Sequence, residues 1–100
     1  MNNDRFLNFL GICKRAGKLL SGAETVTKAV NEGKAQIVLF AADVSENSLM
    51  AVIKAARIKD VPIRRIPQSK EELSFALGKH CGIVCTTDSG FAKKISELIN

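Results

Sequence analysis

Residues 21–28, Ser-Gly-Ala-Glu-Thr-Val-Thr-Lys, carry the groups in this chain that are best suited to binding chemistry. The pattern predicts that they join the end of a strand to the first turns of a helix. The first N–H groups of a helix have no partner within the helix, so they attract anions. Gly22 permits close approach of a ligand backbone, and Lys28 can donate to the guanine acceptors O6 and N7. The segment therefore predicts a site for a polyanion, with these candidate contacts: Gly22, Ala23, Glu24, Thr25 and Lys28.

The same spacing has a second explanation, in which the helix face is exposed and binds nothing. Glu24, Lys28 and Asn31 fall together on one face of the predicted helix. A Glu–Lys pair four residues apart stabilises a helix by roughly 0.2–0.5 kcal/mol. An acid in the first turn also interacts favourably with the helix dipole. The spacing alone leaves both explanations open.

The overall charge favours a nucleic-acid partner. The formal net charge is +5, the sequence pI is about 9.4, and lysine and arginine gain affinity by releasing the counterions condensed on phosphates. With five Phe and no Trp or Tyr, a surface of aromatic rings that stacks bases is not expected. For each basic candidate the alternative to a phosphate contact is that the cation keeps the protein soluble or interacts favourably with a helix C-terminus. The candidates for phosphate contacts are Lys14, Arg15, Lys18 and Lys34.

The hydrophobic pattern predicts helices alternating with strands. Helices are expected at 4–16, 22–32, from 45 or 47 to 59, at 69–78 and from 88 onward, and strands at 19–20, 36–41, 62–66 and 82–87. The apolar run 36–41 is typical of a central strand covered on both faces. Ser69 with Glu72 predicts a capping box. These elements predict an α/β fold, a three-layer α-β-α sandwich with a four-stranded mixed sheet, as a single domain over residues 1–100.

His80, Cys81 and Cys85 are metal-ligating residue types. In one extended strand the two cysteines would face the same side about 13 Å apart, at roughly 3.3 Å per residue. One zinc ion needs sulfur ligands at about 2.3 Å, so this spacing does not suit it. We therefore expect no metal site and no cofactor.

Asp43 follows the predicted strand 36–41, where α/β enzymes often place a catalytic acid. No second carboxylate, glycine-rich phosphate loop or set of nucleophile and base accompanies it. We therefore expect no catalytic residues and no enzymatic activity, with Asp43 ordering a turn. No apolar run approaches the roughly 20 residues of a membrane helix, and no signal peptide is evident. These features predict a cytoplasmic protein with reduced cysteines and no membrane partner.

The sequence resembles a known family over nearly its whole length. Segments 11–22, 26–30 and 33–39, followed by Ala41-Ala-Asp43, resemble the ribosomal protein L7Ae family of kink-turn RNA-binding proteins. Arg15-Ala-Gly-Lys18 and residues 90–94 are similar to its small bacterial branch, the YlxQ-like proteins. The resemblance implies an α-β-α sandwich that binds kink-turns, which are sharply bent RNA motifs with tandem sheared G·A pairs. In the family, the helix after the glycine enters the widened major groove, where an Asn-Glu pair and a lysine read the G·A pairs.

Individual positions agree with the family motif only in part. Gly22 and Lys28 match its glycine and lysine, whereas its Asn-Glu pair falls on Glu24-Thr25. The family's loop between the fourth helix and the last strand covers an extruded base. Here this loop is more polar than in the family and reads Lys79-His80-Cys81-Gly82.

The resemblance implies a function as well as a fold. It implies a protein that binds structured RNA, with a kink-turn in ribosomal RNA and the ribosome itself as candidate partners, and with no small-molecule substrate. Glu24 supports an alternative function, because a carboxylate repels phosphate and cannot donate as Asn does. The alternative is a protein-interaction module on the same scaffold with weakened or lost RNA recognition.

Overall fold

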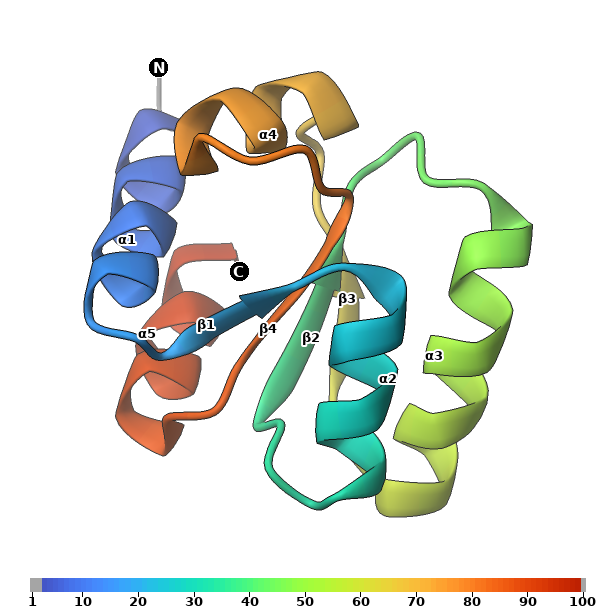
Figure 1. The fold of residues 1–100 in the computed structure, drawn as a ribbon. Coiled ribbons are helices and arrows are strands. Elements are labelled where there is room, and N and C mark those ends of the chain that lie inside the picture. Colours follow the sequence, from blue (N-terminus) through green and yellow to red (C-terminus); the bar gives the residue numbers. More distant parts are fainter. Residues whose placement is uncertain (1–2, 100) are drawn as a thin grey trace.

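Helices and strands alternate along the chain, as the sequence predicts. The computed structural model describes residues 3–99 (Figure 1). In chain order the elements are α1 (Asn3–Arg15), β1 (Leu19–Ser21), α2 (Ala23–Asn31), β2 (Ile37–Phe40), α3 (Glu46–Lys59), β3 (Ile63–Arg65), α4 (Lys70–Leu77), β4 (Ile83–Thr86) and α5 (Ser89–Ile99). Every helix in this part of the chain is too short or too polar to span a lipid bilayer.

The four strands form one mixed sheet in the order β1-β4-β2-β3. Strands β2 and β3 are parallel, and β4 runs antiparallel to both of its neighbours. The register places Ser21 opposite Val84, and Phe40 opposite both Ile83 and Arg65. The ends of β1, β2 and β3 and the start of β4 therefore lie at the same edge of the sheet.

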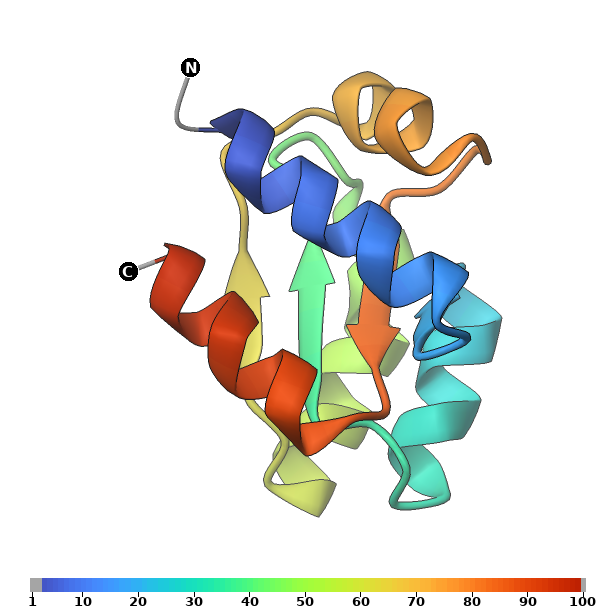
Figure 2. The same ribbon diagram turned by 90° about the vertical axis from the view of Figure 1, so that its left-hand side faces the viewer.

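The helices cover the sheet in two layers. Helices α2 and α3 pack on one face, and α1, α4 and α5 lie on the other (Figures 1 and 2). Ile37 and Leu39 of β2 join the core beneath α1, α4 and α5, whereas Val38 joins the core beneath α2 and α3. Side chains alternate along a strand, so a strand that is apolar at every position supplies both cores. This arrangement confirms the three-layer sandwich and the central placement of β2.

Capping groups fix where the helices begin. Ser69 and Glu72 form the predicted capping box of α4, and the Asp88 carboxylate accepts from the Phe91 N–H at 2.9 Å. At α3 the cap is Ser45 rather than Asn47. Strands β2, β3 and β4 are one residue shorter than predicted at each end, because apolar patterning extends beyond the residues that pair in the ladder, whereas β1 is one residue longer.

The two cysteines near the last strand lie in different cores. Cys81 precedes β4 and packs beneath α1 and α4, whereas Cys85 lies within β4 and packs beneath α2 and α3. The prediction that both face the same side is therefore wrong, because Cys81 is outside the strand whose alternation that prediction assumed. Burial raises the pKa of Cys85 to about 11, so its thiol stays protonated at neutral pH. The side chains of residues 5–99 include no group of three His, Cys, Asp or Glu arranged to hold a metal ion.

Candidate nucleic-acid interface

Four loops meet at the edge of the sheet where β1, β2 and β3 end. Three of these loops lead into α2, α3 and α4, and the fourth leads from α4 into β4. Backbone hydrogen bonds join them: the Gly22 N–H donates to the Ile83 carbonyl at 2.9 Å, and the Ala41 N–H donates to the Gly82 carbonyl at 2.8 Å. The start of α2 and the α4–β4 loop, far apart in sequence, are therefore neighbours in the fold.

Gly22 is the residue that turns the chain from β1 into α2. Its φ of 100° and ψ of 140° are a backbone conformation that side-chain-bearing residues rarely adopt. Space is not the constraint there, since an added Cβ would come no closer than 4.0 Å to the Thr25 hydroxyl. No side chain among the described residues caps the first N–H groups of α2. The helix therefore presents these donors and its positive dipole end at its start.

The candidate side chains of α2 divide between two sides of the helix. Glu24 and Lys28 are exposed and line an open groove between α2 and α3, which we call the α2–α3 groove, of about 650 Å³. Thr25 instead lines a smaller hollow of about 160 Å³ on the other side of the helix start. Ala23 faces the groove and a further hollow that includes His80. The predicted contacts thus surround the helix start rather than forming one stripe.

Glu24 and Lys28 do not form the ion pair that their spacing allows. The one salt bridge among the side chains of residues 5–99 joins Lys34 and Glu32 at 3.3 Å. Lys34 also lies beyond the far end of α2, about 15 Å along the helix from its start at 1.5 Å per residue. The structure therefore does not bring Lys34 together with the other candidates.

The basic residues of α1 differ in their surroundings. The Lys14 ammonium donates to the Leu77 carbonyl at the end of α4, and it lines the Thr25 hollow together with Lys79. An ammonium has three donors, so this bond leaves Lys14 with donors for a ligand. Arg15 and Lys18 are exposed but line none of the hollows described here.

The α4–β4 loop is held against its neighbours by two contacts. The Ser74 hydroxyl donates to the Cys81 carbonyl and accepts from the Cys81 N–H, both at 3.0 Å. At Gly82 an added Cβ would lie 2.7 Å from a methyl carbon of Val44, so only glycine fits without a shift. Lys79 and His80 are exposed, whereas Cys81 is only 5% exposed. The structure therefore corrects the expectation that the Cys81 side chain contacts a ligand, because that side chain points into the core.

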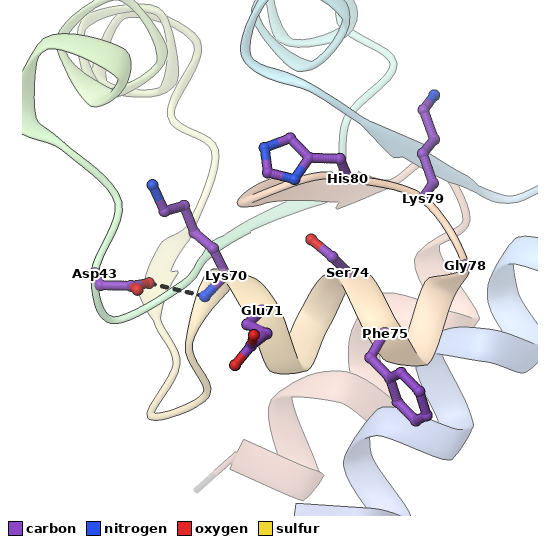
Figure 3. A pocket seen from close by; sticks show the side chains of 8 residues that line it. All are labelled: Asp43, Lys70, Glu71, Ser74, Phe75, Gly78, Lys79 and His80. Carbon is purple, nitrogen blue, oxygen red and sulfur yellow. Dashed lines mark hydrogen bonds between the residues drawn. The ribbon is translucent and has the colours of Figure 1, made fainter.

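Asp43 has the turn-ordering role expected of it. Its carboxylate accepts from the Lys70 N–H at 2.8 Å, at the start of α4 (Figure 3). The same view shows Lys79 and His80 on the loop that follows α4, with Ser74 pointing toward that loop. Asp43 therefore joins the β2–α3 loop to the start of α4.

Sequence reasoning missed the contribution of α3. Asn47 and Ser48, in the first turn of α3, line the same groove as Lys28. Their residue types suggested only a helix cap, and nothing local in the sequence indicates which neighbouring helix lies beside them. Strand order sets that neighbour, because it places α2 and α3 side by side on one face.

Comparison with known proteins gives consistent matches over almost the whole chain. A sequence model of the Ribosomal protein L7Ae/L30e/S12e/Gadd45 family matches residues 5–96. The chain is 36% identical over 98 residues to the RNA-binding protein YlxQ of Enterococcus faecium, covering 98% of this chain and 94% of that protein. It is 31% identical to the RNA-binding protein YlxQ of Bacillus subtilis (strain 168), and the match covers 100% of both.

Solved structures share the fold. A protein with unknown function from Bacillus halodurans C superposes with a TM-score of 0.86 and 29% identity, covering 94% of this chain and 95% of that one. The 15.5kD RNA binding protein of Giardia lamblia superposes with a TM-score of 0.77 and 24% identity, covering 98% of this chain and 84% of that one.

Proposed function

Because the chain belongs to the Ribosomal protein L7Ae/L30e/S12e/Gadd45 family, we propose that it is a non-enzymatic protein that binds structured RNA. Two relatives that match nearly the full chain are named RNA-binding proteins, which supports this function. The RNA that we propose is a kink-turn, in ribosomal RNA or another structured RNA, and the ribosome is a candidate partner in the cytoplasm. The observation that carries the proposal is the exposed Lys28 one turn inside a helix that begins at Gly22.

Recognition would centre on the start of α2. The glycine backbone admits the bent RNA, and the uncapped N–H groups with the helix dipole attract a phosphate. Lys28 projects into the α2–α3 groove and donates to guanine O6 or N7. Its ammonium is not occupied by Glu24, so no internal ion pair has to break before it binds.

Phosphates on either side of the bend would contact the neighbouring cations. Lys14 and Lys79 flank Thr25 in the smaller hollow, where the Thr25 hydroxyl adds a donor. Arg15 and Lys18 would contact the RNA only where it extends beyond the bend. Lys34, which is paired with Glu32 at the other end of α2, would contribute least.

The α4–β4 loop would cover an unpaired base. His80 and Gly82 line a hollow of about 200 Å³ next to Ala23, and Lys70 lies on its other side. Since Cys81 is buried and clamped by Ser74, this loop is preformed rather than ordered by the ligand. A preformed loop avoids an entropy cost on binding.

Glu24 favours one alternative, a protein-interaction module on the same scaffold. Its exposed carboxylate lies at the helix start, where it opposes a phosphate. The test is titration of a kink-turn RNA and a straight duplex of equal length at about 0.1 M salt, because salt sets the strength of non-specific binding. We expect tighter binding to the kink-turn; equal affinity for the two RNAs would remove the kink-turn proposal, and no binding to either would favour the alternative.

A further inference from the structure

Asn47 lies across the α2–α3 groove from the proposed base-reading lysine. It is exposed in the first turn of α3, and it lines this groove together with Glu24 and Lys28 of α2. The α2 wall therefore carries the Lys28 ammonium, the Glu24 carboxylate and, from the last residue of that helix, the Asn31 amide, whereas the α3 wall carries the Asn47 amide. A base edge within the groove would meet hydrogen-bonding groups from both helices.

The fold does not use the Asn47 side chain. The cap of α3 is Ser45, whose hydroxyl accepts from the Ser48 N–H at 3.4 Å. Among the groups of residues 5–99 the Asn47 amide makes no hydrogen bond. Its donors and acceptor are therefore directed to solvent or to a ligand.

An amide can make a pair of hydrogen bonds that Lys28 and Glu24 cannot. A lysine ammonium only donates and a carboxylate only accepts, so neither Lys28 nor Glu24 can satisfy a base edge that presents one donor beside one acceptor. Adenine presents such an edge, with the N6 amino group beside N7, and an asparagine amide pairs with both at once. Two amides of the groove match that edge. Asn31 is the last residue of α2, whereas Asn47 is in the first turn of α3, at the end of the groove where α2 also begins (Figure 1). Asn47 is therefore the amide on the side of the proposed binding site.

We propose that Asn47 is a second base-reading residue, whose amide pairs with N6 and N7 of an adenine close to the guanine that Lys28 contacts. This inference rests on the proposed RNA-binding function and deepens it, because it gives α3 a part in sequence recognition. The adenine is one whose N6–N7 edge is free, in a Watson–Crick pair of a flanking stem or in an unpaired position. The adenine of a sheared G·A pair uses that edge to bind its guanine.

The experiment begins with selection of RNAs from a randomised pool on the full-length protein. The enriched RNA is then titrated with wild type, Asn47→Ala and Asn8→Ala. Asn8 is the matched control, because it is an exposed asparagine on α1, in the opposite layer of the sandwich. We expect Asn47→Ala to weaken binding by roughly 5- to 150-fold, the range for one lost bidentate base contact. Asn8→Ala should stay within about twofold of wild type.

A change in the RNA separates base reading from a general loss of binding. Replacing the contacted adenine by 7-deazaadenine, which lacks the N7 acceptor, should weaken binding by wild type but not by Asn47→Ala. Equal melting temperatures of the three proteins show that folding is intact. If wild type enriches an RNA but Asn47→Ala binds it equally well, or still discriminates against 7-deazaadenine, this inference is wrong and the proposed function stands. If wild type enriches no RNA, the proposed function fails and this inference fails with it.

Discussion

The Asp43 carboxylate accepts a hydrogen bond from the Lys70 N–H at 2.8 Å, across 27 positions of sequence (Figure 3). Lys70 is the first residue of α4, so this bond joins the β2–α3 loop to the start of another helix. It satisfies one of the N–H groups that a helix start leaves without a partner. The candidate interface therefore depends on an acid that does not itself have to touch RNA.

Replacement of Asp43 tests this link. Asp43→Ala should lower the free energy of unfolding by about 1 kcal/mol, the usual cost of losing a side chain that caps a helix start. Urea denaturation measures the change. The matched control is Glu71→Ala, which removes an exposed acid from the first turn of α4 whose carboxylate makes no hydrogen bond among the side chains of residues 5–99. Equal losses in the two variants would show that charge, rather than the hydrogen bond, is responsible.

Replacement by alanine should lower the stability of the protein at Gly22 and raise it at Gly11. Gly22→Ala places a Cβ on a residue with φ of 100°, which costs about 1–3 kcal/mol of strain. Gly11→Ala lies within α1, where the new Cβ meets only an Arg15 nitrogen at 3.7 Å, and alanine should stabilise the helix by about 0.5–1 kcal/mol. Thermal melts of the two variants check the signs, and a stable Gly22→Ala would contradict the strain argument.

Lys28 should matter more to RNA binding than another exposed lysine. Lys28→Ala removes the proposed guanine contact, so kink-turn affinity should fall by about 1–3 kcal/mol. Lys93→Ala removes the same charge from an exposed position on α5, in the other layer, and should have a much smaller effect. Titration of both variants at one salt concentration makes the comparison, and similar losses would indicate only general electrostatic attraction.

Glu24 should weaken RNA binding rather than support it. Glu24→Asn removes a carboxylate from the helix start and introduces the asparagine that the family motif has at this position. The affinity for a kink-turn RNA should therefore rise. A unit charge at about 4 Å from a phosphate in water is worth about 1 kcal/mol, which corresponds to roughly fivefold. Glu97→Gln, which removes an exposed acid from α5, controls for net charge. Weaker binding by Glu24→Asn would show that the carboxylate accepts from the RNA, and unchanged binding would contradict the predicted repulsion.

Alkaline pH should destabilise the protein through Cys85. Its pKa is raised by burial from 9.0 to about 11, so the unfolded thiol ionises at lower pH than the folded one. The stability associated with the protonated thiol is therefore complete below pH 9.0 and is lost as pH rises toward about 11. Cys85→Val, which keeps an apolar side chain in the strand, should show a smaller loss over this range in urea denaturation. Identical pH profiles of wild type and Cys85→Val would indicate that the other buried cysteines cause the loss of stability at alkaline pH.

Local sequence patterns determined which elements form. The apolar run 36–41 predicted a strand covered on both faces, and Ser69 with Glu72 predicted the start of α4. These patterns succeed because a helix turn or a cap involves residues within four positions of one another. The exposed Lys28 and the glycine at the start of α2 could be predicted for the same reason, since helical periodicity fixes which side of α2 is buried.

Tertiary structure alone decided which of these groups share a surface. Thr25 and Lys28 lie three positions apart but line different hollows, whereas Lys28 and Asn47 line one groove. Cys81 and Cys85 enter opposite cores because only Cys85 belongs to the strand. The physical reason is that strand order and register depend on pairing between distant segments, which no local pattern specifies. The sequence determined the elements and the exposed side of α2, and the packing of α3 beside α2 and of the α4–β4 loop at its start determined the shape of the surface around it.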